Sequence, residues 1–194
     1  MIKRLIDIVA SAVGLLVASP LLLAAGVAIK LTSPGPVLFA QERVGRGFRP
    51  FRILKLRTMR MHPAGEQPQI TAGGDPRVTR VGRVLRRFKV DELPQLLNVL
   101  RGDMSLVGPR PEVPKYVEMF HEDYVEVLRC RPGITDLASI EYRHEEDVLA
   151  AAADPEQAYV TAVLPHKIAL AKDYVRRRST LLDLQIIART LRSL

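Results

Sequence analysis

The sequence predicts a mostly α-helical protein with a small β-hairpin element, preceded by an apolar helix that associates with a membrane. Three observations lead to this class. Residues 8–29 form a run of 22 positions without a charge. Two extended stretches flank the turn sequence at 45–48, which is the pattern of a hairpin. In the second half of the chain, apolar residues recur every three or four positions, which is typical of helices.

Composition excludes several classes of protein. The 194 residues are 47% hydrophobic, which excludes a disordered tail, a collagen-like fibre and a low-complexity array. The single cysteine, Cys130, excludes an intramolecular disulfide framework and a cysteine-rich zinc site. The net charge of +8 is concentrated in two windows, 41–60 and 77–89, which each carry +6 and leave −4 for the rest.

The apolar run is long enough to cross a bilayer, because 22 helical residues extend about 33 Å and a hydrocarbon core is about 30 Å thick. A secretory signal peptide has a shorter apolar region and no Ser19-Pro20 at its centre. Basic residues flank both ends, including Lys3, Arg4 and Lys30, and positive flanks favour the cytoplasmic side. Pro20 supplies the means to bend the helix back. From the residues alone, a re-entrant and a spanning helix both remain open.

A turn-rich hinge at 32–36 marks the expected boundary between two parts of the chain. Residues 1–36 are expected to form the membrane helix and hinge, and residues 37–194 a compact cytoplasmic catalytic domain. Within that domain, 37–44 and 50–59 are expected to pair as the hairpin.

The remaining elements follow from apolar spacing and end signals. Asp75 and Pro76 are expected to cap and begin one helix, and Pro94 to lie in the first turn of the next. The polar stretch 61–74 reads as a loop, and 101–114 as an ordered loop. Further helices are expected at 113–130, 145–153, 156–178 with a kink at Pro165, and 180–194.

An acidic pair carries the main chemical signal. Asp91-Glu92 follows six cations with no intervening acid. Adjacent carboxylates among arginines can hold Mg²⁺ and a phosphate together, and one carboxylate can attack phosphorus. A structural reading is equally open, in which Asp91 caps a helix and Glu92 favours its dipole. Arg110, between two prolines, is either presented from a stiff loop or solvated in a turn.

The chain resembles a known family across almost its entire length. The motifs are SPGPVLFAQERVG, FRILKLRTM, DPRVTRVGRVLRR, VDELPQLLNVLRGDMSLVGPRP and RPGIT, in this order. They are similar to those of the bacterial sugar transferases, the monotopic polyprenyl-phosphate phosphoglycosyl transferases, in their minimal catalytic form. The resemblance implies an enzyme that transfers a phospho-sugar from a UDP-sugar to a polyprenyl phosphate, expected to be undecaprenyl phosphate, and releases UMP. It also implies Mg²⁺ and a ping-pong route.

The resemblance also implies residue roles. Asp91 would be the nucleophile that forms a phosphosugar intermediate, and Glu92, with Asp91, would bind Mg²⁺. Lys55, Arg86 and Arg110 would contact phosphate or nucleotide. Asp183 would lie near the site, although Thr180-x-x-Asp183 also fits a helix-start capping arrangement. Ser19-Pro20 would break the membrane helix so that it re-enters the cytoplasmic face of the bacterial inner membrane.

One stretch departs from the family pattern and leaves the donor sugar open. Asp136 and Ser139 stand where members often have glycine and glutamine, and a Gly-Arg pair is missing. The rival hypothesis is a membrane-tethered basic protein that binds nucleic acid or anionic lipid without catalysis. No recognised nucleic-acid module supports it, so an anionic bilayer and no nucleic acid are the expected partners. The oligomeric state stays open.

Overall fold

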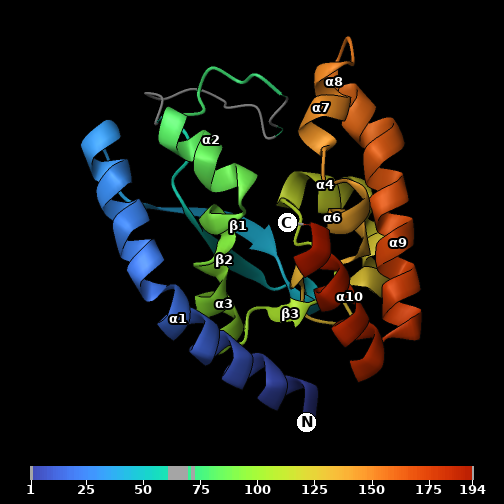
Figure 1. Ribbon diagram of the computed structural model, residues 1–194. Helices are drawn as coiled ribbons and strands as arrows, with labels where there is room; N and C mark the ends of the chain where they lie inside the picture. Colours follow the sequence, from blue (N-terminus) through green and yellow to red (C-terminus); the bar gives the residue numbers. More distant parts are fainter. Residues whose placement is uncertain (1, 61–69, 71–72, 194) are drawn as a thin grey trace.

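The computed structural model describes residues 2–60, 70 and 73–193. Figure 1 shows a long N-terminal helix along one side, a hairpin with two short helices beside it, and the remaining helices on the other side. The helices are α1 (Ile2–Thr32), α2 (Arg80–Arg87), α3 (Gln95–Arg101), α4 (Pro114–Met119), α5 (His121–Val127), α6 (Leu137–Glu141), α7 (Glu145–Ala150), α8 (Pro155–Ala158), α9 (Leu164–Arg177) and α10 (Thr180–Ser193). The strands are β1 (Leu38–Val44), β2 (Pro50–Leu56), β3 (Ser105–Val107) and β4 (Gly133–Thr135). The prediction of a mostly helical chain with a small β element is confirmed.

The helix α1 contains Pro20 yet continues through it, and Figure 1 shows its axis bending along its length. Pro20 has no N–H to donate to the carbonyl of Leu16, four residues earlier. The Ser19 hydroxyl donates to that same carbonyl at 2.8 Å, so the Ser-Pro pair leaves no orphaned acceptor there. By length and composition α1 can cross a membrane. The division of the chain at 36/37 stays a prediction.

The predicted hairpin is confirmed. β1 and β2 pair antiparallel from Leu38 opposite Leu56 to Val44 opposite Pro50, joined by a short 3₁₀ turn at Arg46–Phe48. Side chains alternate between the two faces of a strand. The buried Ile53 therefore shares a face with the partly buried Lys55 two positions on. That alternation directs the Lys55 side chain toward the body of the protein.

A second pair of strands is parallel, and one of them, β3, lies within the stretch 101–114 that was expected to be a loop. Ser105 of β3 pairs with Gly133 of β4, and Val107 with Thr135. The two backbones approach so closely that a Cβ at Gly133 would lie 2.1 Å from the nitrogen of Gly108. Glycine at position 133 is therefore required by this contact, which aligns the chain that follows β3 with the chain that follows β4.

The expected helix start at Asp75-Pro76 is wrong. Asp75 instead accepts hydrogen bonds from the backbone and guanidinium of Arg77, which close a turn, and Val78 forms a bridge with Met59. After this turn, Val78 and Thr79 are extended, and the Thr79 hydroxyl accepts from the nitrogen of Gly82 and caps α2. Residues 61–69 and 71–72 of the expected loop at 61–74 lie outside the described residues.

Three other expectations need correction. The helix expected at 113–130 divides at Phe120, whose φ of −117° is not helical. The helix expected at 156–178 runs without interruption over 155–177, but Tyr159–Val163 widens into a π turn just before Pro165, and the kink at Pro165 stays a prediction. Proline lacks the N–H that an α-register would need, which favours this local shift. The helix at 137–141 was not expected, and Asp136 caps it.

The core has one large cluster and three smaller ones. The large cluster joins the helical side to the end of β1, and its largest buried side chains are Tyr116, Tyr124 and Tyr159. A smaller cluster joins the second half of α1 to the hairpin and α2, through Ala25, Ile29, Leu56 and Leu85. The apolar helix α1 is thus packed against the rest of the protein rather than separate from it.

Candidate active site

The acidic pair lies in a 3₁₀ turn at Val90–Glu92, between α2 and α3. Lys89 precedes it in the left-handed region, with φ 55° and ψ 19°, which is uncommon for a residue other than glycine. This turn directs both carboxylates inward, where Asp91 is 6% and Glu92 9% exposed. Asp91 does not cap α3, because Pro94 occupies that position, so the capping interpretation is wrong.

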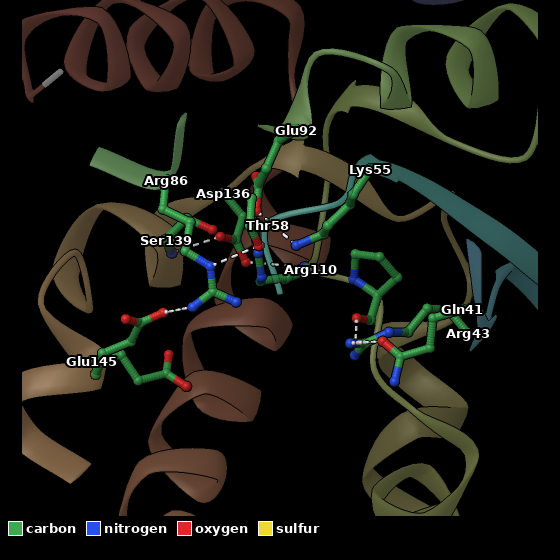
Figure 2. Close-up of polar contacts among 12 residues, drawn as sticks. Gln41, Arg43, Lys55, Thr58, Arg86, Glu92, Arg110, Asp136, Ser139 and Glu145 are labelled. Atoms are coloured by element: carbon green, nitrogen blue, oxygen red, sulfur yellow. Dashed lines mark hydrogen bonds and ion pairs between the residues drawn. The ribbon is translucent and has the colours of Figure 1, made fainter. Parts of the chain in front are cut away.

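Glu92 is held by two cations from separate elements. Its Oε1 accepts from Lys55 Nζ of β2 at 2.9 Å and from Arg110 Nη2 at 2.6 Å. Figure 2 shows Lys55 and Arg110 converging on Glu92. The other carboxylate oxygen has only a longer contact of 3.5 Å to Arg110. Lys55, Glu92 and Arg110, which are expected to share a site, are therefore in contact.

Asp91 is the less satisfied of the two acids. Its Oδ1 is buried and accepts no hydrogen bond from any residue that the structure describes. Burial raises the pKa of Asp91, while the charge of Lys55 opposes that rise. A raised pKa makes a carboxylate a better nucleophile once it is ionised.

The pKa of Glu92 moves the other way. Burial alone would raise it, but Arg110 and Lys55 hold the pKa of Glu92 well below its usual value. Burial lowers the pKa of Lys55, and Glu92 offsets part of that shift. Glu92 in turn raises the pKa of Arg110. The two neighbouring carboxylates thus occupy different electrostatic environments, a pattern that assigns them different roles.

Asn98 fixes the spacing between the turn that carries the acidic pair and β2, which carries Lys55. Its side chain is fully buried, and its Oδ1 accepts from the nitrogen of Leu54 while its Nδ2 donates to the carbonyl of Arg52. One amide of α3 thus satisfies two backbone groups on the outer edge of β2. Lys55 follows directly, so Asn98 sets how far Lys55 lies from Glu92.

Arg86 reaches the site from α2. Its Nε donates to the Thr58 hydroxyl at 3.0 Å, and its Nη1 contacts Glu146 at 2.7 Å. Its charge favours the ionised form of Asp91. The first turn of α2 can lie this close to Thr58 because Gly82 has no Cβ; a Cβ there would be only 2.0 Å from the carbonyl oxygen of Thr58.

Asp183 lies in a different cluster. Its Oδ1 accepts from the Tyr174 hydroxyl at 2.7 Å and its Oδ2 from Lys3 Nζ at 2.6 Å. Lys3 Nζ also donates to the carbonyl of Val107 at the end of β3 at 3.0 Å, and the Tyr174 hydroxyl lies 3.2 Å from the same carbonyl oxygen. The structure does not bring Asp183 into contact with Glu92. Its contacts connect α10, α1 and the strand that leads to Arg110.

A metal at this site would have few protein ligands. Among the described residues, no group of three or more histidine, cysteine, aspartate or glutamate side chains is placed to hold a metal ion. Asp91 and Glu92 are the two adjacent acids that the fold buries here. Mg²⁺ often takes one or two carboxylates and completes its shell with water and substrate phosphate. The unpartnered Oδ1 of Asp91 fits such a ligand.

A buried acidic pair close to Lys55, Arg86 and Arg110, beside a long apolar helix, has the features of an enzyme site, and cations placed in this way can stabilise phosphate groups. The chain belongs to the bacterial sugar transferase family, whose model matches residues 1–194. This agrees with the motifs in the sequence.

Individual relatives give the comparison more detail. The chain is 45% identical to the UDP-glucose:undecaprenyl-phosphate glucose-1-phosphate transferase of Caulobacter vibrioides, over 99% of this chain and 69% of that protein. It is 42% identical to the UDP-N-acetylgalactosamine-undecaprenyl-phosphate N-acetylgalactosaminephosphotransferase of Aeromonas hydrophila, over 100% of this chain and 43% of that protein. The Escherichia coli UDP-glucose:undecaprenyl-phosphate glucose-1-phosphate transferase is 37% identical, over 96% of this chain and 39% of that protein. The chain thus spans less than half of the second and third of these relatives.

Sequence reasoning missed several residues that build the site. Asn98 carries a weak signal, since it is a polar residue within the leucine-rich helix that follows the acidic pair. Away from the acidic pair, Asp7 of α1 accepts from Ser105 and Leu106 of β3, and it carries a better signal because it is the acid that directly precedes the apolar run. Thr58 and Glu146 carry no signal, because only the fold brings them to Arg86.

Proposed function

We propose that the chain transfers a phospho-sugar from a UDP-sugar to undecaprenyl phosphate, giving the polyprenyl-diphosphate-sugar and UMP. Such a transfer is the first membrane step of glycan assembly. The names of the relatives support the substrate classes. The observation that carries the proposal is the acidic pair, in which Glu92 is tied to Lys55 and Arg110 while Oδ1 of Asp91 has no partner.

In the first step the ionised carboxylate of Asp91 attacks the phosphorus that bears the sugar. A bond forms between Asp91 oxygen and this β-phosphorus, and the bond from β-phosphorus to the bridging oxygen breaks. Its electron pair leaves with UMP. Arg110, Lys55 and Arg86 offset the repulsion between the carboxylate and the diphosphate.

In the second step a phosphate oxygen of the polyprenyl phosphate attacks the same phosphorus. The Asp91–phosphorus bond breaks, and the carboxylate is regenerated while the lipid diphosphate-sugar departs. One site therefore serves a soluble donor and a lipid acceptor in turn, which is the logic of covalent catalysis.

Asp91 and Glu92 are the residues that would hold Mg²⁺. The bound ion would neutralise charge on the donor diphosphate. Because Lys55 and Arg110 already occupy Oε1 of Glu92, the Asp91 carboxylate and the other oxygen of Glu92 would be the groups that hold it.

For α1 we propose a re-entrant, monotopic placement on the cytoplasmic face of the bacterial inner membrane. Both halves of the helix dock on one folded body. Near its start, Arg4 donates to the carbonyls of Val99 and Leu100, and Asp7 accepts from Ser105 and Leu106. Near its end, Arg57 donates to the carbonyl of Ser33.

These contacts conflict with a spanning helix. A straight helix of 31 residues is about 46 Å long and would place its ends on opposite sides of the bilayer. One soluble body cannot then hold both. Between the docked ends, large apolar side chains face outward, with Leu16 76%, Val17 74% and Leu23 72% exposed. These side chains provide the surface that enters the lipid.

The proposed activity is tested by UMP release from a panel of UDP-sugars in the presence of undecaprenyl phosphate and Mg²⁺. A second assay follows labelled UMP as it exchanges into UDP-sugar without acceptor. We expect release with at least one sugar, and exchange that does not need the lipid. No release from any UDP-sugar would refute the activity, and exchange that requires acceptor would refute the two-step route.

The topology is tested with single cysteines on a Cys130→Ser background. Ile2→Cys and Thr32→Cys place exposed thiols at the two ends of α1, and Glu122→Cys marks the side of the folded body. With a membrane-impermeant maleimide, we expect all three to resist labelling in intact spheroplasts and to react in lysed membranes. Labelling of one helix end in intact spheroplasts would establish a spanning helix.

The pH dependence of donor cleavage is expected to shift in Lys55→Met. Asp91 must be ionised to attack, so the rate falls as pH drops through its pKa, which burial raises and Lys55 lowers. Removing the lysine charge raises that pKa further, and the acid limb of the residual rate moves to higher pH. Lys115→Met, which changes an exposed lysine, is expected to leave the limb in place. If the acid limb of the pH–rate profile stays in place or moves to lower pH in Lys55→Met, Asp91 is not the ionising nucleophile.

A further inference from the structure

The main-chain N–H of Arg110 donates a hydrogen bond to a buried carboxylate. Arg110 lies between Pro109 and Pro111, which have no N–H. Its own N–H is therefore the only main-chain donor in this three-residue stretch. The Oδ2 of Asp136 accepts that N–H at 3.1 Å. Figure 2 shows Asp136 beside Arg110, with Ser139 close by.

Asp136 is itself fixed in place. It is 3% exposed, and its Oδ1 accepts from the nitrogen of Ser139 at 2.7 Å as the cap of α6. One carboxylate therefore bridges the first turn of α6 and the Arg110 loop. A buried carboxylate with two defined N–H donors is a rigid connector, because both oxygens are committed.

The two strands prepare this bridge. The nitrogen of Gly133 donates to the carbonyl of Pro109 at 2.9 Å, and the nitrogen of Gly108 to that of Thr135 at 3.1 Å. The chain after β3 thus runs beside the chain after β4. At the next position the backbone pairing ends, and the Asp136 side chain supplies the acceptor that the backbone no longer provides.

We infer that Asp136 is a positioning residue for the phosphoryl-transfer site, and that it acts through the main chain of Arg110. The inference rests on the proposed function, in which the Arg110 guanidinium holds Glu92 and meets the donor diphosphate. The contact between Arg110 Nη2 and Glu92 is 2.6 Å. A loop that rotates at residue 110 moves this guanidinium away from both, so Asp136 controls the geometry of a group that it touches only at the backbone.

The test begins with Asp136→Asn, which keeps the shape of the side chain. Whichever way the amide is turned, an NH₂ group opposes one of the two N–H donors. A second variant, Asp136→Ser, retains a good helix cap for α6 but is too short to reach Arg110. Each variant is expected to lower kcat for UDP-sugar cleavage about tenfold, the effect of one lost hydrogen bond on a transition state. Asp154→Asn, which alters the cap of α8 away from the site, is the matched control with activity unchanged.

A double-mutant cycle separates positioning from general structural damage. Asp136→Ser is combined with Arg110→Ala, and cleavage is measured well below each thermal unfolding midpoint. In the Arg110→Ala background the second change is expected to add less than about a twofold loss, because its route to the donor is already gone. Equal losses in both backgrounds would overturn the inference, as would full activity of folded Asp136→Ser. If the unaltered chain cleaves no UDP-sugar at all, the proposed function fails instead.

Discussion

Replacing Asp91 with asparagine is expected to abolish the exchange of labelled UMP into UDP-sugar, with a loss of at least about 10³-fold. The change preserves shape and burial but removes the charge and the nucleophilic oxygen pair. The Oδ1 of Asp91 makes no hydrogen bond, so the fold loses no existing contact through that atom. The measurement is initial-rate exchange without acceptor, at saturating Mg²⁺, alongside a thermal melt to show that the variant is folded.

A trapping experiment separates a nucleophile from a metal ligand. The protein is incubated with a donor labelled in the sugar and quenched in acid, without lipid acceptor. Label is expected to stay with the unaltered protein and to be absent from Asp91→Asn. Asp173→Asn, at a half-exposed acid paired with Arg177, is the control and should trap label normally. Label retained by Asp91→Asn would assign the nucleophile to another residue.

Local patterns predicted those parts of the fold that are stabilised locally. The hairpin follows from two short stretches and the turn between them, and α10 from its apolar spacing. The β3–β4 pair was missed because its strands have three residues each and lie far apart in the sequence. The start of α2 was misplaced because Arg77 engages Asp75, which a capping pattern alone does not reveal.

The candidate site likewise contains residues that motifs predict and residues that only the fold brings together. Motifs placed Lys55, Glu92 and Arg110 in one site, and the fold brings their charged groups into contact. Asp183 came from the same resemblance, yet the structure pairs it with Lys3 and Tyr174. No spacing rule could predict Asn98 as a brace, because its partners lie on a strand more than forty residues earlier. Long-range polar contacts of this kind need the assembled fold.

The packing of α1 changes how the apolar run is understood. As a sequence it allows a spanning and a re-entrant helix equally. In the fold, Lys3, Arg4 and Asp7 all bond the body before the apolar run begins. A helix that only anchored the protein would not need an acid such as Asp7, both of whose carboxylate oxygens accept hydrogen bonds from the body. These bonds also place the apolar surface in a fixed relation to the strand leading to Arg110, where a lipid-borne acceptor would meet the site.

Replacing Glu92 with glutamine is expected to lower donor cleavage by about 10²-fold or more and to destabilise the fold by about 2–3 kcal/mol. The amide oxygen can still accept from one cation, but Lys55 and Arg110 lose the charge that holds them together. The estimate lies below the usual cost of breaking a buried pair, because 33% of the Arg110 side chain stays exposed. Burial lowers the pKa of Lys55, and without Glu92 it falls further.

Stability and metal dependence can be measured on the same Glu92→Gln variant. The pKa of Glu92 is lower in the folded chain than in the unfolded one, so its stabilising contribution exists above about pH 4.5 and is lost as pH falls through the folded pKa. The stability of Glu92→Gln is expected to lack this pH-dependent contribution. The variant is also expected to need more Mg²⁺ for half-maximal UMP release. Glu126→Gln, which breaks a two-bond pair with Arg176 away from the acidic turn, is the matched control. Glu92→Gln with an unchanged Mg²⁺ requirement would remove Glu92 from the proposed metal site and leave it a role only in holding Lys55 and Arg110.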